Sequence, residues 1–268
     1  MTDRTGDLAI IAGALIAAGE VLTGYESGRI AVARKHNQDP VTEADLACDR
    51  ILKEILLQPG EGWLSEETAD DFERLNCARV WVVDPIDGTK EFASGIDEWC
   101  VSVGLVEDEI PVAGGIYNPA AGFLALGADG LGCTLNGQPA CRSENSGLDK
   151  AVVLASRTEI GRGQWDSWLA APFTIEAMGS VAYKMARVAC GLAEATWTVV
   201  PKHEWDIAAG TALVRSVGGV VTRPDDKPLR FNQDSPWVPG LIVIGPGQAR
   251  WFDSNVISTE VLSMAQIK

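Results

Sequence analysis

The segment WVVDPIDGTKEF (Trp81–Phe92) changes abruptly from an apolar run to a charged, glycine-containing stretch. Its first apolar residues predict a buried strand. The segment then becomes polar within a few residues, with carboxylates at Asp84 and Asp87 and a Gly-Thr pair after them. Pro85 has no amide donor and a fixed φ, which favours a turn at the strand end. Such a turn can direct both carboxylates to one concave side.

Two carboxylates held this close repel each other, and each raises the pKa of the other unless a cation lies between them. Mg²⁺ prefers carboxylate oxygens together with water and substrate phosphate. Gly88 permits close backbone approach, and the amides of Gly88 and Thr89 form an anion-binding corner if they open a helix. We therefore interpret the segment as part of a metal-bridged phosphate site. The alternative is a capped turn, because Asp-Pro and Asp-Gly are common turn pairs.

Further acidic segments have the residue types of such a site, and each also has a purely structural interpretation. Glu66 in WLSEET can ligate a metal, or it can lie in the first turn of a helix capped by Ser65. Asp45 in PVTEADL has the spacing of a capping box with Thr42. Asp206 in HEWDIAAG can act as the N-cap of a helix. Each signal is weak alone, but their joint presence favours a site.

Hydrophobic periodicity outlines the elements along the chain. Helices are expected at 6–24, 42–57, 180–195, 205–219 and from about 251 to 268. Strands are expected at 29–35, 79–84, 101–108, 111–119, 150–156, 174–178, 196–200 and 241–245, with a turn-rich meander over 122–140 and a hairpin turn at Asn136-Gly137. Antiparallel strands are expected before about residue 145, and strands that alternate with helices are expected after it. The sequence therefore predicts an α+β unit at 1–145 and an α/β unit at 146–268.

Composition excludes several classes of function. The chain has 268 residues, and 22 Lys and Arg against 37 Asp and Glu give a net charge of −15, which disfavours nucleic acid and anionic membranes as partners. Its six cysteines have no C-x-x-C spacing, so neither a zinc site nor a redox motif is indicated. The N-terminus lacks a signal-peptide pattern, and no stretch approaches the ~20 apolar residues of a membrane span. A soluble cytoplasmic protein is expected.

DPIDGT (84–89) and WDIAAG (205–210) resemble two signatures of the inositol monophosphatase-like superfamily of Mg²⁺-dependent, lithium-sensitive phosphatases. LSEET, PVTEAD and GSVAYKMARVACGLAEA are similar to further stretches of that family. The matches keep the family's order and spacing over nearly the whole chain. The resemblance implies a five-layered α-β-α-β-α sandwich with the site between its halves. It also implies inhibition by Li⁺ and assembly as a homodimer.

The resemblance implies two or three Mg²⁺ ions per site, held by residues of these motifs. Glu66, Asp84 and the Ile86 carbonyl would hold one ion, and Asp84, Asp87 and Asp206 would hold a second. A third, weaker ion would use Glu66 and water. Two metal ions suit this chemistry because together they clamp the attacking and leaving oxygens and lower the pKa of bound water.

The resemblance also implies the catalytic and phosphate-binding roles. Thr89, oriented by Asp45, would help Glu66 to position and deprotonate the attacking water. The amides of Gly88 and Thr89, beside Asp87, would hold the phosphate. In-line displacement at phosphorus depends more on positioning than on covalent chemistry, so these groups would suffice.

The choice of substrate depends on the residues directly after Thr89. Inositol-type members usually read Asp-Gly-Thr-Thr-Asn-Phe, whereas this chain reads DGTKEF at 87–92, which is similar to the CysQ-like 3'(2'),5'-bisphosphate nucleotidase branch. Lys90 adds positive charge that suits a substrate with two phosphates, although it can equally pair with Glu91. We expect hydrolysis of adenosine 3',5'-bisphosphate to AMP. Inositol 1-phosphate and histidinol phosphate are the alternative substrates.

A few other residues are candidates for contact with the substrate. Ser180 would open the helix that borders the substrate pocket, or it acts as a plain N-cap. Glu204 lies where relatives contact sugar or ring hydroxyls, and His203 either touches the substrate or flanks a helix start. Trp99 and Trp237 can each stack on an adenine if exposed, and the sequence does not choose between them.

Overall fold

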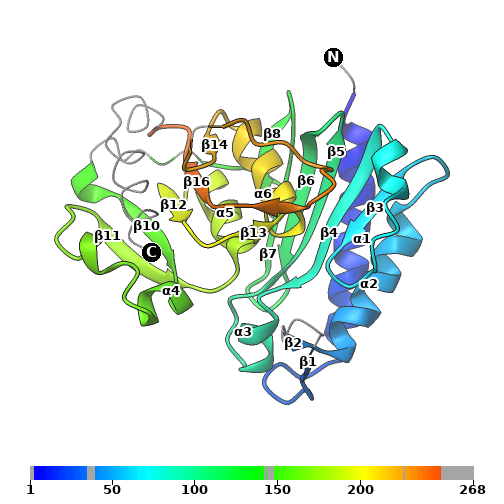
Figure 1. Ribbon diagram of the computed structural model, residues 1–268, viewed down its shortest axis with the longest axis horizontal. Helices are drawn as coiled ribbons and strands as arrows, with labels where there is room; N and C mark the ends of the chain where they lie inside the picture. Colours follow the sequence, from blue (N-terminus) through cyan, green and yellow to red (C-terminus); the bar gives the residue numbers. More distant parts are fainter. Residues whose placement is uncertain (1–2, 35–39, 142, 144–147, 226, 249–268) are drawn as a thin grey trace.

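The computed structural model describes residues 3–34, 40–141, 143, 148–225 and 227–248 of the chain. Figure 1 shows alternating layers of helices and sheets, with α1 and α2 on one side and the strands β10 and β11 on the other. The helices are α1 (Thr5–Leu22), α2 (Glu43–Leu56), α3 (Thr89–Ala93), α4 (Arg157–Gly161), α5 (Val181–Ala189) and α6 (Glu204–Ser216). The helix expected at 251–268 lies outside the described residues.

The strands form two main sheets. The first has the order β3-β4-β5-β6-β7-β8-β9, with the members β3 (Gly62–Ser65), β4 (Arg79–Asp87), β5 (Cys100–Glu107), β6 (Ile110–Asn118), β7 (Phe123–Ala128), β8 (Gly132–Leu135) and β9 (Gln138–Pro139). The second has the order β11-β10-β12-β16-β14, with β10 (Val152–Ser156), β11 (Thr174–Met178), β12 (Ala195–Thr198), β14 (Val220–Thr222) and β16 (Leu241–Ile244). Short pairs are β1 (Ala33–Arg34) with β2 (Pro40–Val41), and β13 (Lys202–His203) with β15 (Trp237–Val238).

Strand β4 lies inside the first sheet and is buried on both faces. Side chains alternate along a strand, so Trp81 and Val83 pack into the hydrophobic cluster that contains residues of α1 and α2. Val80 and Val82 pack on the opposite face, into the cluster that contains residues of α5 and α6. This explains why the strand is a continuous apolar run. The strand continues past its expected end at Asp84 to Asp87, and its pairing with β5 shifts register between these two residues.

Helix α1 covers the outer face of the first sheet together with α2. It is long and apolar enough in composition to cross a membrane, contrary to the expectation that no stretch approaches this. Its buried residues, including Ile11, Leu15 and Leu22, pack in the same cluster as Leu52 of α2 and Trp81 of the sheet. These contacts explain the apolar composition of α1 as that of a core helix.

Helix α6 packs directly on the middle of the first sheet because small residues meet there. A Cβ on Gly104 of β5 would lie 2.9 Å from Cβ of Ala208, and one on Gly114 of β6 would lie 2.7 Å from the carbonyl oxygen of Ala209. Gly210 gives the same close approach to the neighbouring helix, since a Cβ there would lie 2.6 Å from Met185 of α5. The DIAAG part of the motif therefore fixes the position of α6 and of Asp206 in its first turn.

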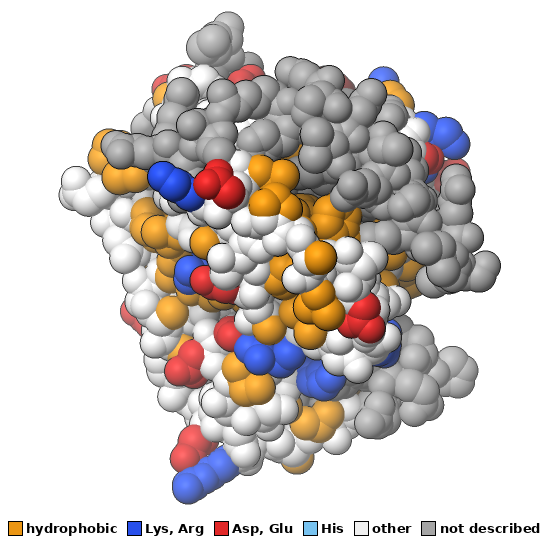
Figure 2. Space-filling view, turned by 90° about the vertical axis from the view of Figure 1, so that its left-hand side faces the viewer, with side chains coloured by type: hydrophobic (Ala, Val, Ile, Leu, Met, Phe, Trp, Pro, Cys, Tyr) orange, Lys and Arg blue, Asp and Glu red, His pale blue; other side chains and the backbone are white. Residues whose placement is uncertain are grey.

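The second sheet is parallel from β11 through β10 to β12 and antiparallel from β12 through β16 to β14. Its outer face packs against an aromatic cluster that includes Trp165, Trp168 and Phe173 around Trp197. Figure 2 shows the side of the molecule at the left of Figure 1, where acidic and basic side chains are interspersed with hydrophobic ones. Together with α4, these segments complete an α-β-α-β-α order of layers.

The structure corrects several expected elements. Ser65 ends strand β3, so the alternative interpretation of Ser65 as the N-cap of a helix is wrong. The helix expected at 180–195 ends at Ala189, and Gly191 follows with a φ of 71° beside the Cys141 carbonyl. The hairpin turn at 136–137 is confirmed, since both residues have positive φ between β8 and β9.

The expected division at residue 145 falls beside residues that the structure does not describe. The cluster between the two sheets combines residues of both segments, such as Val82 and Ile116 with Met185 and Leu213. The division into units at 1–145 and 146–268 stays a prediction about folding units. The site described below draws on both segments.

Candidate metal and phosphate site

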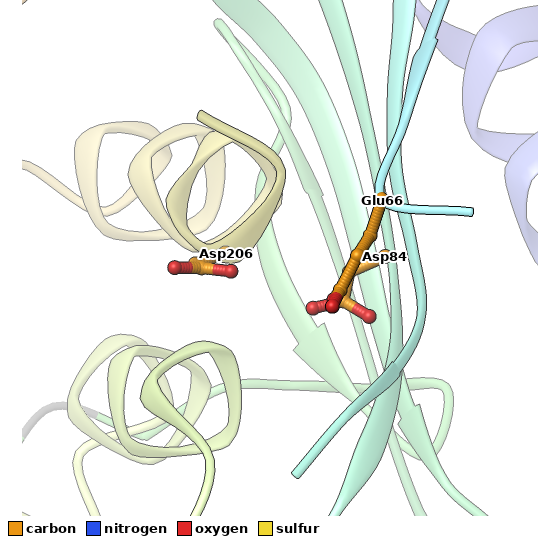
Figure 3. Close-up of side chains that lie close together, drawn as sticks. All are labelled: Glu66, Asp84 and Asp206. Carbon is orange, nitrogen blue, oxygen red and sulfur yellow. The ribbon is translucent and has the colours of Figure 1, made fainter. Parts of the chain in front are cut away.

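Three carboxylates from three separate elements converge beside the end of β4. Ligand oxygens of Glu66, Asp84 and Asp206 all lie within 4.8 Å of one another. Figure 3 shows Glu66 and Asp84 extending from the sheet toward Asp206, which reaches across from the first turn of α6. These residues come from three of the motifs singled out in the sequence, and the fold brings them together.

Local structure explains how each carboxylate is held. Glu66 directly follows β3, which pairs in parallel with β4. The Glu66 amide continues this pairing by donating to the Val83 carbonyl at 3.3 Å. The Asp84 side chain is buried and accepts a hydrogen bond from the Ile86 amide at 3.0 Å. Asp206 accepts from the His203 amide at 2.9 Å, in a capping box with His203 as the N-cap. Asp206 is therefore at the third position of its helix, and not at the N-cap.

The electrostatics of this cluster are unfavourable without a cation. Burial, followed by the charges of Glu66, Asp87 and Asp206, raises the pKa of Asp84 well above its usual range. Burial and then the Asp87 charge raise the pKa of Asp206 to about 8. A divalent cation would relieve both effects, and the donors are the hard oxygens that Mg²⁺ prefers. The residues present therefore fit the metal that the sequence implies.

Asp87 lies beside this triad but faces the N-terminus of α5. Its Oδ2 accepts hydrogen bonds from the Ser180 hydroxyl at 2.7 Å and from the Ala182 amide at 2.5 Å. Burial raises the pKa of Asp87, whereas these hydrogen bonds lower it. The Ser180 hydroxyl also accepts from the Tyr183 amide at 3.0 Å, so Ser180 is the N-cap of α5. Ser180 therefore links the helix start to one of the expected metal ligands.

Thr89 and Asp45 form the expected pair. The Thr89 hydroxyl oxygen lies 3.1 Å from Asp45 Oδ1 and 3.0 Å from the Ile86 carbonyl oxygen, and it can donate to either. The second oxygen of Asp45 accepts from the amide of Thr42 at 2.8 Å and from its hydroxyl at 2.6 Å. One oxygen of Asp45 therefore caps α2, and the other faces Thr89.

Gly88 makes the turn between β4 and α3. Its φ is 101°, and a Cβ there would lie 3.0 Å from the Glu98 carbonyl oxygen. Only glycine avoids both the left-handed strain and this close approach. The amides of Gly88 and Thr89 thus stand at the start of α3, beside the carboxylates, and the exposed Lys90 follows them.

Two adjoining cavities meet at Asp87 and Asp206. The outer cavity, of about 390 Å³, is lined by the carboxylate triad, Thr89 and an aromatic group. The inner cavity, of about 160 Å³, extends toward β12 and α5 and is lined by Lys184, Lys202, Thr196, Thr198 and Ser180, among others. The Lys184 ammonium donates to the Met178 and Gly179 carbonyls at 3.3 and 3.5 Å. Burial and then the Lys202 charge lower the pKa of Lys184 to about 8.

Glu204 lies elsewhere. Its buried carboxylate accepts from the amides of Asn232 and Gln233 at 2.6 and 3.0 Å, and Arg74 binds Asn232 Oδ1 at 2.8 Å. Burial raises the pKa of Glu204 to about 7. Glu204 lines neither cavity, so this placement does not support the prediction that it contacts a substrate. It instead fixes the segment after β14 against α6.

Comparison with known proteins assigns the family. Residues 5–249 match the profile of the Inositol monophosphatase family. The chain belongs to the inositol monophosphatase family. The curated proteins of this family that are similar to the chain are phosphoric monoester hydrolases. This agrees with the resemblance seen in the motifs.

Relatives of two kinds are similar to the chain. Inositol monophosphatase 3 of Solanum lycopersicum is 35% identical over 207 residues, which is 72% of this chain and 76% of the relative. The 3'(2'),5'-bisphosphate nucleotidase CysQ of Aggregatibacter actinomycetemcomitans is 32% identical over 240 residues, which is 85% of this chain and 88% of the relative. The family is therefore established, and its members of both kinds are similar to this chain.

Solved structures confirm the fold. The inositol monophosphatase of Anabaena (Nostoc) has a TM-score of 0.75 at 28% identity, covering 98% of this chain and 96% of that one. CysQ of Bacteroides thetaiotaomicron has a TM-score of 0.74 at 28% identity, covering 90% of this chain and 97% of that one. The predicted family sandwich is thus confirmed, with an arrangement of layers shared by both kinds of relative.

Sequence reasoning did not assign Lys184 and Lys202 to the site. Lys184 lies in the GSVAYKMARVACGLAEA stretch, four residues after Ser180, which places both residues on one helix face. Lys202 lies four residues before Asp206, on a strand of only two residues, and no periodic signal marks it. The sequence also did not show which tryptophan lines the outer cavity, because the exposure of a side chain cannot be read from its residue type.

Proposed function

We propose that this protein is a Mg²⁺-dependent phosphomonoesterase that removes the 3'-phosphate of adenosine 3',5'-bisphosphate to leave AMP. The observation that carries the phosphatase assignment is the convergence of Glu66, Asp84 and Asp206 within 4.8 Å, beside the Thr89–Asp45 pair. We further propose two or three Mg²⁺ ions per site, inhibition by Li⁺ and a homodimer, as the family resemblance implies. We also propose the cytoplasmic location expected from the sequence.

The carboxylates would hold the metal ions. Glu66, Asp84 and the Ile86 carbonyl would hold one, and Asp84, Asp206 and Asp87 a second. When bound, Mg²⁺ supplies charge stabilisation of the phosphate oxygens and a lowered pKa for a water ligand. Asp87 presents one oxygen to α5, which leaves its other oxygen to serve as a ligand.

The chain's own residues would position the reactants. The amides of Gly88 and Thr89 at the start of α3 would donate to the phosphate oxygens. The Thr89 hydroxyl would donate to Asp45 and accept a hydrogen bond from the attacking water, while Glu66 would accept that water's proton. The new bond from the water oxygen to phosphorus would form as the bond from phosphorus to the 3'-oxygen breaks. Glu66 would carry the proton from the water, and the leaving 3'-alkoxide would take a proton from solvent.

The substrate assignment is supported by positive charge around the two cavities. Lys90 and Lys202 line both cavities, and Lys184 lines the inner one. The nearby charge of Lys202 disfavours the charged form of Lys184, and a substrate anion beside them would relieve that repulsion. A bisphosphate has one phosphate for the metal site and a second for these lysines, whereas an inositol monophosphate has only one.

Inositol 1-phosphate is the second candidate, because inositol monophosphatases are among the most similar curated relatives. Histidinol phosphate would use the same metal site. Steady-state kinetics with adenosine 3',5'-bisphosphate, inositol 1-phosphate and histidinol phosphate, at saturating Mg²⁺, distinguishes them. We expect the highest kcat/KM for the bisphosphate and a fall of about tenfold or more in Lys202→Met. A higher kcat/KM for inositol 1-phosphate would overturn the nucleotide assignment.

A further inference from the structure

An aromatic wall stands on one side of the outer cavity, facing the space beside the carboxylate triad. It consists of His203, Trp205 and Trp237, and all of them line the same cavity as Glu66 and Asp84. The His203 ring stacks on Trp205 with centroids 4.2 Å apart and planes inclined by 13°, and it contacts Trp237 at 3.8 Å and 45°. His203 is thus sandwiched, and Trp237 forms the outer end of the wall.

Backbone pairing positions the residues of this wall. His203 and Trp237 are directly paired in the antiparallel β13–β15 ribbon, which puts their side chains on the same face. Helix α6 starts immediately after His203, and the Glu204 amide donates to the Pro236 carbonyl at 2.9 Å. The wall is therefore tied on both strands to the helix that carries Asp206.

Trp237 is 56% exposed, although the wall otherwise packs well. A single exposed hydrophobic residue on a protein surface needs no explanation. Trp237 differs because it belongs to a stacked group and because it lines the cavity of the metal site. Trp99, the other candidate left by the sequence, is 4% exposed and packs edge-on against Phe92, so it cannot meet a ligand.

We propose that the aromatic wall, with Trp237 as its contact residue, stacks on a planar ring of the substrate and thereby selects phosphate esters that carry a nucleobase. This inference rests on the proposed function and deepens it, because it assigns the part of the site that recognises the base. Every nucleobase has a π-face that stacks on an aromatic side chain. An inositol ring has no π-face, so it cannot stack on the wall in this way.

Binding measurements test the wall without relying on turnover. AMP and ribose 5-phosphate share a sugar phosphate and differ only in the base, so the ratio of their Kd values isolates recognition of the base. We expect the full-length protein to bind AMP about 5- to 150-fold more tightly than ribose 5-phosphate, the range of stacking contributions. Trp237→Ala should bring that ratio close to one by weakening only AMP, and Trp237→Phe should keep most of it.

Leu169→Ala is the matched control, since Leu169 is 77% exposed and lines neither cavity. An unchanged preference for AMP in Trp237→Ala, or equal loss of affinity for both ligands, would overturn the inference. Turnover measurements distinguish a failure of this inference from a failure of the proposed function. If adenosine 3',5'-bisphosphate is hydrolysed and Trp237→Ala lowers its kcat/KM no more than that of glycerol 2-phosphate, only the inference fails. If the bisphosphate is not hydrolysed while inositol 1-phosphate is, the proposed function fails.

Discussion

Asp45 and Thr89 lie 44 residues apart in sequence, and their side chains meet with the Thr89 hydroxyl 3.1 Å from Asp45 Oδ1. The other carboxylate oxygen of Asp45 binds the amide and the hydroxyl of Thr42. One carboxylate thus both starts helix α2 and orients the hydroxyl beside the carboxylate triad. We expect the two contacts of Asp45 to be separable by mutation, because they use different oxygens.

Thr89→Ala should reduce kcat about 100-fold or more, because the attacking water loses the hydroxyl that positions it. Thr89→Ser keeps a hydroxyl at the same place and should retain most of the activity. KM and the thermal midpoint should change little in either variant. Steady-state kinetics with circular dichroism melting checks this. Equal activity of Thr89→Ala and Thr89→Ser would show that the hydroxyl takes no part.

Thr42→Ala should have the opposite profile. It removes the side-chain half of the α2 capping box and should lower the free energy of unfolding by about 1 kcal/mol. Asp45 keeps the Thr42 amide as a donor and still faces Thr89, so kcat should stay within about threefold of the unmodified protein. Urea denaturation and kinetics measured on the same preparation test both halves. A loss of kcat as large as that of Thr89→Ala would show that the two functions are inseparable.

The stability of the metal-free protein should fall as the pH rises. The pKa of Asp206 is raised to about 8 and that of Asp84 is raised as well, so their stabilising protonated forms are present at low pH and are lost as pH increases. The decline should run from about pH 4, where the unfolded carboxyls ionise, to about pH 8. Mg²⁺ should replace the lost protons, and its effect on the melting temperature should therefore be larger at pH 8 than at pH 5.

Asp206→Asn provides the control for this prediction. It removes the titrating carboxylate while keeping the shape of the side chain, and it should flatten the pH dependence of the metal-free protein. Scanning calorimetry with and without Mg²⁺ at several pH values measures both effects. A Mg²⁺-induced rise in melting temperature that is the same at pH 5 and pH 8 would contradict this prediction.

The glycines under α6 should be needed for the position of Asp206. Gly114→Ala places a Cβ 2.7 Å from the Ala209 carbonyl oxygen, so the helix must shift away from the sheet. We expect a loss of about 1–3 kcal/mol in unfolding free energy and weaker Mg²⁺ binding. Gly13→Ala is the matched control, because it lies in exposed α1 surface with nothing within 4 Å of a new Cβ. It should be neutral or slightly stabilising.

The sequence predicted the parts of this fold that depend on local chemistry. The apolar run before Asp84, the capping box at Thr42 and the Asn136-Gly137 turn are all encoded by neighbouring residues. The strand β3 was missed because four residues with a Trp-Leu pair and an acidic continuation resemble a helix start as much as a strand. Only its pairing with β4 settles the choice, and pairing is not a local property.

The site was predicted less completely than the fold. The motifs identified the three carboxylates. That they lie together depends on the contact of small residues between α6 and the sheet, such as Gly104 against Ala208. The choice of Trp237 over Trp99 and the position of Lys202 on the cavity wall follow from burial and strand pairing. The placement of Glu204 among backbone amides likewise depends on a segment almost thirty residues later in the chain.

Mg²⁺ binding by Asp84→Asn shows whether the converging carboxylates hold a metal ion. Isothermal titration of the metal-free, full-length protein at pH 8 should show Mg²⁺ binding with release of protons, and Asp84→Asn should weaken it at least tenfold. The same variant should melt at a higher temperature than the unmodified protein when no metal is present, because a buried, repelled carboxylate has been removed. Mg²⁺ affinity that is unchanged in a folded Asp84→Asn would contradict the assignment of these carboxylates as a metal site.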